Sequence, residues 1–113
     1  MESILTSIKK LLGVYEEDEN FDTDIIIHIN TAFMSLTQLG VGPTEGFRIK
    51  DDTSIWADFI NTDDTMLYEA IKTYIYLRVK LIFDPPSSGA TTEVYKETIK
   101  ELEWRLNVTA DPG

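Results

Sequence analysis

The sequence predicts an all-α fold: a small bundle of four main helices and one short helix, with a long glycine-rich loop between the second and third helices. Apolar residues recur at three- and four-residue steps along four segments, and glycine, proline and helix-capping residues separate these segments. A length of 113 residues, 42% hydrophobic and 27% charged, is ordinary for one globular domain. We therefore expect a single helical domain over residues 1–108 and a flexible tail over residues 109–113.

The longest apolar segment, Met66–Phe83, is expected to be the central helix. One face of this helix is formed by Leu67, Ala70, Ile71, Tyr74, Leu77 and Leu81. A second apolar face is formed by Ile75, Val79, Ile82 and Phe83. Four charged residues spread through the segment exclude a membrane span, because charges at mid-bilayer depth are costly.

End signals bound the other helices. We expect a first helix from the Ser3 cap to about Leu12, with Gly13 as its stop. A second helix is expected over Ile25–Leu39, preceded by Asp22 and Thr23 and ended by Gly40. Further helices are expected over Ser54–Ile60 and over Thr91–Leu106. The loop 40–52 contains three glycines and one proline and is expected to be exposed, and the prolines of segment 84–90 end the central helix.

Second apolar faces occur on three of the predicted helices. They are formed by Ile27 and Met34, by Ile75, Val79 and Ile82, and by Val94, Trp104 and Val108. A domain of this size buries only about two-thirds of its unfolded surface, and it has few helices with which to cover two faces of each. We therefore expect contacts between subunits, with Ile27, Met34, Ile75, Val79 and Ile82 at the interface.

The net charge of −10 is unevenly distributed. Residues 16–24 hold six acids and residues 51–64 hold five, and neither segment contains a basic residue. Proteins that grip DNA cluster lysine and arginine, whereas the ten basic residues here are scattered. The composition therefore disfavours direct DNA binding, but an acidic surface along which DNA slides without sticking is compatible with it.

No catalytic, cofactor-binding or metal-binding site is predicted. The chain has no cysteine, and its single histidine, His28, has no partners at metal-ligand spacing. The acids of residues 18–24 resemble the start of a calcium loop, but Thr23 and Ile29 stand where glycine and glutamate are required. Helix capping and a solvated run of charge account for these acids.

Most of the chain resembles the head-tail connector (neck adaptor) proteins of tailed phages. The matching segments are ILTSIKKLLGV, FDTDIIIHIN, TQLGVGPTEGF, YIYLRVKLIFDPP and EWRLNV. The resemblance implies a homo-oligomeric ring of roughly a dozen subunits under the portal protein, joined head to tail. Such a ring lies in the neck of the virion, is assembled in the host cytoplasm, extends the DNA channel and docks the next neck or tail-completion protein.

The resemblance also implies roles for individual residues. By analogy, the C-terminal segment contacts the portal through Trp104, Arg105, Asn107 and Val108. The acidic loops expected to face the DNA channel contain Glu16, Glu17, Asp18, Glu19, Asp51 and Asp52. No enzymatic activity, cofactor or membrane is implied. Two alternatives stay open: a DNA-packaging accessory protein acting with the terminase, and a small helical adaptor domain that binds a peptide.

Overall fold

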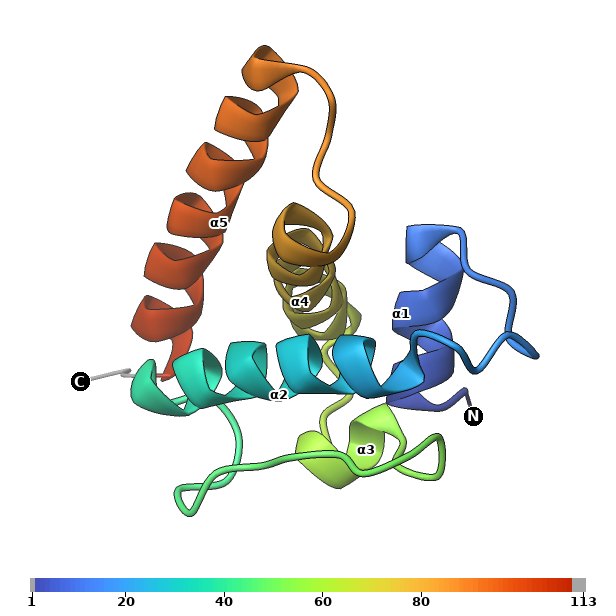
Figure 1. The fold of residues 1–113 in the computed structure, drawn as a ribbon. Coiled ribbons are helices and arrows are strands. Elements are labelled where there is room, and N and C mark those ends of the chain that lie inside the picture. Colours follow the sequence, from blue (N-terminus) through green and yellow to red (C-terminus); the bar gives the residue numbers. More distant parts are fainter. Residues whose placement is uncertain (1, 111–113) are drawn as a thin grey trace.

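The computed structural model describes residues 2–110, which form five helices and no strand (Figure 1). These helices are α1 (Ile4–Leu12), α2 (Asp22–Gln38), α3 (Trp56–Phe59), α4 (Thr65–Phe83) and α5 (Gly89–Ala110). The predicted all-α fold of four main helices and one short helix is confirmed.

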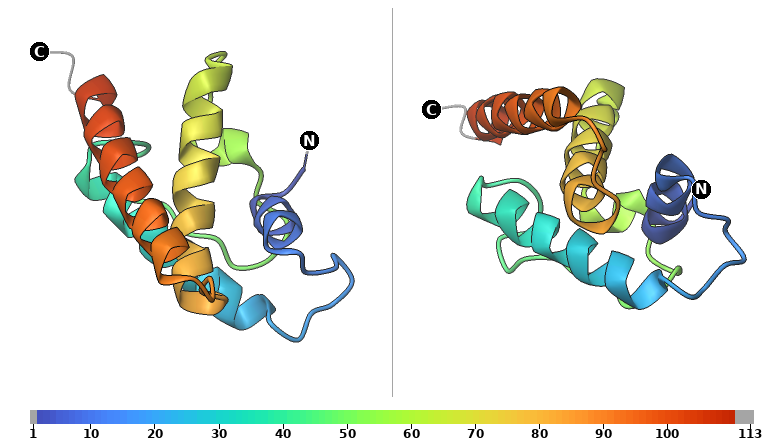
Figure 2. Two further views of the ribbon diagram at one scale, coloured as in Figure 1. Left: turned by 90° about the horizontal axis from the view of Figure 1, so that it is seen from above. Right: turned by 45° about the horizontal axis from the view of Figure 1, so that its top comes forward.

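Helix α4 lies at the centre of the molecule. Helices α1 and α5 flank it on opposite sides, and α2 runs across all three (Figures 1 and 2). The predicted core face of α4 is buried at Ile71, Tyr74 and Leu77. On α2, residues Ile25, Ile29, Phe33 and Leu36 are buried against it, as their spacing predicts.

The predicted helix ends are set by local hydrogen bonds. The Thr6 amide donates to the Ser3 hydroxyl at 3.0 Å and the Leu67 amide to the Asp64 carboxylate at 3.1 Å, so both N-caps are satisfied. Gly13 ends α1 in the left-handed conformation, with φ of 80°. Helix α5 starts earlier and ends later than predicted, so residues 109 and 110 of the expected tail are helical. Residues 111–113 of that tail lie outside the described part of the chain.

The glycine-rich loop is non-helical, as predicted, but it is not exposed throughout. Val41 and Ile49 are buried, because the loop folds back against α2 and α3. The Asn30 side chain holds it there: its amide donates to the Ile49 carbonyl at 3.0 Å and its oxygen accepts from the Ile49 amide at 2.8 Å. Gly42, with φ of 85°, lies so close to Phe59 that an added Cβ would meet the ring at 2.4 Å.

Polar contacts at one point join α2, α4 and α5. The Arg78 guanidinium donates to the Ser35 hydroxyl at 2.6 Å and to the Tyr74 hydroxyl at 2.8 Å. The Tyr74 hydroxyl in turn donates to the Glu103 carboxylate at 2.8 Å. The same carboxylate lies 3.7 Å from the Arg78 guanidinium. These contacts orient α5, of which only Leu106 is fully buried.

Candidate interaction surfaces

An apolar groove lies between α2 and the glycine-rich loop. We call it the loop groove; its lining residues are Ile27, Asn30, Met34, Glu45, Gly46, Phe47 and Arg48. The side chains of Ile27 and Met34 are 54% and 65% exposed, so the predicted second face of α2 is present on the surface. The pairing of Asn30 with Ile49 holds the loop that forms the other wall.

The second face predicted on α4 is mostly absent from the surface. Ile75 and Val79 are both 0% exposed, because α1, α2 and α5 cover the central helix from different sides. The expectation that these two residues face another subunit is therefore corrected: they belong to the core of the single chain. Only Ile82, at the end of α4, is exposed as predicted.

Helix α5 presents an exposed apolar face. We call it the outer face of α5; it contains Val94, Trp104 and Val108, and Trp104 is 68% exposed. Arg105 is also exposed and is held by Glu101 at 2.8 Å, the pair that the four-residue spacing predicts. The Asn107 amide instead donates to the Leu39 carbonyl at 3.2 Å, so this side chain ties the end of α5 to the end of α2.

The first acidic segment is organised by a lysine that the sequence analysis missed. Lys9 is buried in α1, and its ammonium donates to the carbonyls of Glu16 and Asp18 at 2.9 and 2.7 Å. It also lies 2.8 Å from the Asp22 carboxylate at the start of α2. Two carbonyl acceptors and one carboxylate at ion-pair distance surround this buried cation and fix the path of the loop between the two helices. In the sequence, the signal for this contact is a lysine within the apolar stripe of a short helix that is followed by acidic residues.

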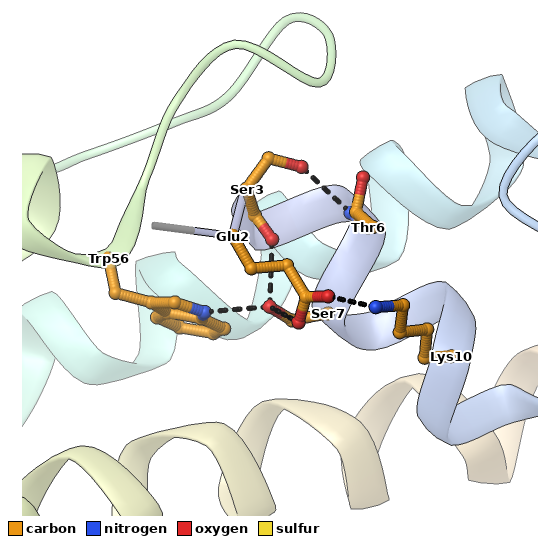
Figure 3. Close-up of polar contacts among 6 residues, drawn as sticks. All are labelled: Glu2, Ser3, Thr6, Ser7, Lys10 and Trp56. Carbon is orange, nitrogen blue, oxygen red and sulfur yellow. Dashed lines mark hydrogen bonds and ion pairs between the residues drawn. The ribbon is translucent and has the colours of Figure 1, made fainter.

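The two acidic segments meet beside α1. Glu16 and Asp52, which are distant in the sequence, line one surface depression with Glu2 and Lys10. Lys10 forms an ion pair with Glu2, and this hydrogen bond lowers the pKa of Glu2 and raises the pKa of Lys10 (Figure 3). The structure therefore brings one residue of each acidic segment, Glu16 and Asp52, together beside α1.

A buried polar contact anchors α3 to α1. The Trp56 indole nitrogen donates to the Ser7 hydroxyl at 3.1 Å (Figure 3). The Ser7 hydroxyl lies 3.0 Å from the Glu2 carboxylate and 2.8 Å from the Ser3 carbonyl, two alternative acceptors for its single proton. The contact has a structural role, since none of these groups faces a nucleophile or a base in a catalytic arrangement.

Arg48 and Lys50 differ from the other basic residues. Eight of the ten bases form ion pairs: Lys9, Lys10, Lys72, Arg78, Lys80, Lys96, Lys100 and Arg105. Arg48 and Lys50, both on the glycine-rich loop, have no acidic partner among residues 2–110. Sequence reasoning did not single them out, because pairing depends on the fold.

The described part of the chain contains neither a candidate membrane span nor a candidate metal site. No helix of residues 2–110 is long and apolar enough to cross a lipid bilayer. Within the same residues, no group of three or more histidine or acidic side chains is placed to hold a metal ion. His28 is half-buried at the edge of the α2 core stripe.

Comparison with known proteins gives one result. A family model described as "Phage connector protein" matches residues 4–113. No curated protein and no solved structure matches the chain significantly. Because the matched segment covers nearly the whole sequence, this protein belongs to the phage connector protein family, which is a family of structural proteins rather than enzymes.

Proposed function

We propose that the protein is a head-tail connector (neck adaptor) that forms a ring under the portal of a tailed phage or prophage. The ring extends the DNA channel and docks the next neck or tail-completion protein. The observation that carries this proposal is the presence of two separate exposed apolar surfaces, the loop groove and the outer face of α5, on one small chain. A free monomer has no use for two such surfaces, whereas a ring subunit is contacted from several directions.

The outer face of α5 is the proposed contact with the portal. Trp104 is a large exposed aromatic residue of the kind that dominates binding energy at protein interfaces. Val108 lies one turn further on, and Arg105 adds a charged group beside both. Asn107 contributes indirectly, because its bond to Leu39 holds the C-terminal end of the helix in place.

Contacts between subunits are proposed at Ile27, Met34 and Ile82, the members of the predicted set that are exposed. The acidic side chains of Glu16–Glu19 and of Asp51 and Asp52 are proposed to face the DNA channel. Their charge repels the phosphate backbone, so DNA passes without being held. This role agrees with the net charge of −10.

Co-sedimentation with purified portal particles tests the proposal. We expect the protein to pellet with the portal at a fixed ratio, and not with double-stranded DNA of mixed sequence. Met34→Asp should reduce the amount bound, because it places a charge in the loop groove. Binding to the terminase without binding to the portal would instead favour a packaging accessory, and capture of neither would overturn the proposal.

A further inference from the structure

The loop groove combines an apolar floor with an unpaired cation. Ile27, Met34 and Phe47 supply the apolar surface, and Arg48 lines the same groove together with Glu45, with which it forms no ion pair. Arg48 has no acidic partner among the described residues, although the chain carries twice as many acids as bases. The occupant that this chemistry recognises is a segment with an exposed apolar or aromatic residue next to acids.

The chain itself carries such a segment in Tyr15–Glu19, which we call the acidic loop. Tyr15 is 79% exposed, and Glu17 and Glu19 are exposed without a basic partner among residues 2–110. The loop is held by Lys9, which binds the carbonyls of Glu16 and Asp18. A loop held in this way loses less conformational entropy on docking than a free one does.

We propose that the loop groove of one copy receives the acidic loop of the next copy. Tyr15 packs against the apolar floor formed by Ile27 and Met34, and Arg48 pairs with Glu17 or Glu19 across the boundary. The inference rests on the proposed function, since it names the surfaces through which ring subunits meet. Groove and loop are different surfaces, so the contact is head to tail and repeats from copy to copy. In this arrangement Glu17 and Glu19 lie at the boundary between subunits and not in the channel wall, whereas Asp51 and Asp52 still face the channel.

Charge reversal on the two sides tests this pairing. Two variants each place like charges together: the single variant Arg48→Glu and the double variant Glu17→Lys with Glu19→Lys. Each should weaken assembly on portal particles about tenfold. Combining all three substitutions should restore assembly towards the wild-type level. Lys100→Glu makes the same charge change as Arg48→Glu on α5, outside the groove, and should not be rescued by the loop substitutions.

Circular dichroism checks that every variant keeps its helices. The loop substitutions leave intact the backbone carbonyls that Lys9 binds, and Arg48 makes no ion pair within the described chain, so we expect no loss of fold. If the combined variant assembles no better than the weaker of its two parents, the pairing is wrong. Weakening by Arg48→Glu without rescue would indicate another acidic occupant, such as the portal, and would likewise overturn it.

Cysteine cross-linking gives a second, independent readout. The natural chain has no cysteine, so a pair introduced by Glu17→Cys and Arg48→Cys is the only source of disulfides. Oxidation on portal particles should give a ladder of covalent oligomers, since each copy links to two neighbours. Either substitution alone should give at most disulfide-linked dimers. The pair Glu17→Cys and Lys100→Cys is the matched control, and an equal ladder from it would contradict the proposed contact.

Different results would contradict the proposed function and the proposed contact between groove and acidic loop. If wild-type protein does not bind portal particles, the proposed function fails, and with it the context for this contact. If the wild type binds and assembles but the reversed charges give no rescue and the Glu17–Arg48 cysteine pair gives no ladder, only the pairing of groove and acidic loop fails.

Discussion

Lys9 shows how much a single buried charge contributes to this small fold. Its side chain is 3% exposed, and its ammonium joins α1, the acidic loop and the first residue of α2. Removal of the cation leaves two carbonyls and the Asp22 carboxylate without their partner. Loss of one member of a buried ion pair is far more costly than loss of a surface pair.

We predict that Lys9→Met lowers the free energy of unfolding by about 3 kcal/mol, because it strands these acceptors. Urea denaturation followed by circular dichroism measures the change. Lys10→Met is the matched control: Lys10 is the neighbouring lysine, its side chain is 58% exposed, and the effect of its loss should be much smaller. Equal losses for the two variants would show that Lys9 does not hold the loop.

Comparing Gly42, in the glycine-rich loop, with Gly13, at the end of α1, tests why the loop needs glycine at residue 42. The reason is either the close approach of Phe59 or the left-handed backbone conformation alone. Gly42 and Gly13 have φ of 85° and 80°, but an added Cβ meets Phe59 at 2.4 Å in one case and nothing within 4 Å in the other. Gly13→Ala should cost about 1 kcal/mol of stability, the strain of the backbone alone. Gly42→Ala should cost clearly more in the same thermal or urea unfolding assay. Similar costs would rule out the close approach.

Tyr74 makes the fold sensitive to alkali. Burial raises the pKa of its hydroxyl above the ordinary value of 10.0, an effect that Arg78 opposes and Glu103 supports. Well below pH 10.0 the hydroxyl is neutral in both the folded and the unfolded state. As the pH approaches and passes this value the unfolded chain loses the proton first, so stability falls until the folded group also ionises. The free energy of unfolding should drop less between pH 9 and pH 11 in Tyr74→Phe than in the wild type. An equal drop would contradict this origin.

At the scale of elements, α4 shows what the sequence could and could not predict. The helix, its Asp64 cap and its core face were predictable, because three- and four-residue spacing and capping chemistry are local. The burial of Ile75 and Val79 was not. It depends on α1 and α5 packing on opposite sides of the helix, and apolar periodicity does not specify how helices cross.

Surface features also divide into those that local sequence predicts and those that depend on how the chain folds. Exposure of Ile27, Met34 and Trp104 was predictable, since each residue lies away from the core stripe of its own helix. The Lys9 contacts and the unpaired state of Arg48 join or separate segments distant in the sequence, so only the folded chain reveals them. The extent of α5 was underestimated because Gly89 and Ala90 lie close behind two prolines, and such positions are usually read as a loop.

Helix α5 also gives the clearest separation of binding from folding. Trp104→Ala should reduce association with portal particles while the helical circular-dichroism signal and the unfolding midpoint stay close to wild type, because the side chain is mostly exposed. Leu106→Ala, two residues away and buried, should destabilise the fold by roughly 3 kcal/mol. Loss of fold in the Trp104 variant would mean that its side chain supports the core.

At the scale of the whole molecule, charge and apolar surface point the same way. A net charge of −10 keeps copies apart in solution and weakens any grip on DNA. Two exposed apolar surfaces nevertheless favour association once a template brings copies together. We therefore expect the isolated protein to assemble weakly, and more readily at raised salt, where repulsion is screened.

Electron microscopy of portal particles mixed with the purified protein is the sharpest test of the proposed ring. We expect an additional closed ring of density, coaxial with the portal and open along the DNA channel, in which every subunit touches two neighbours. Portal particles that bind no added density, or that bind single copies without a ring, would contradict it.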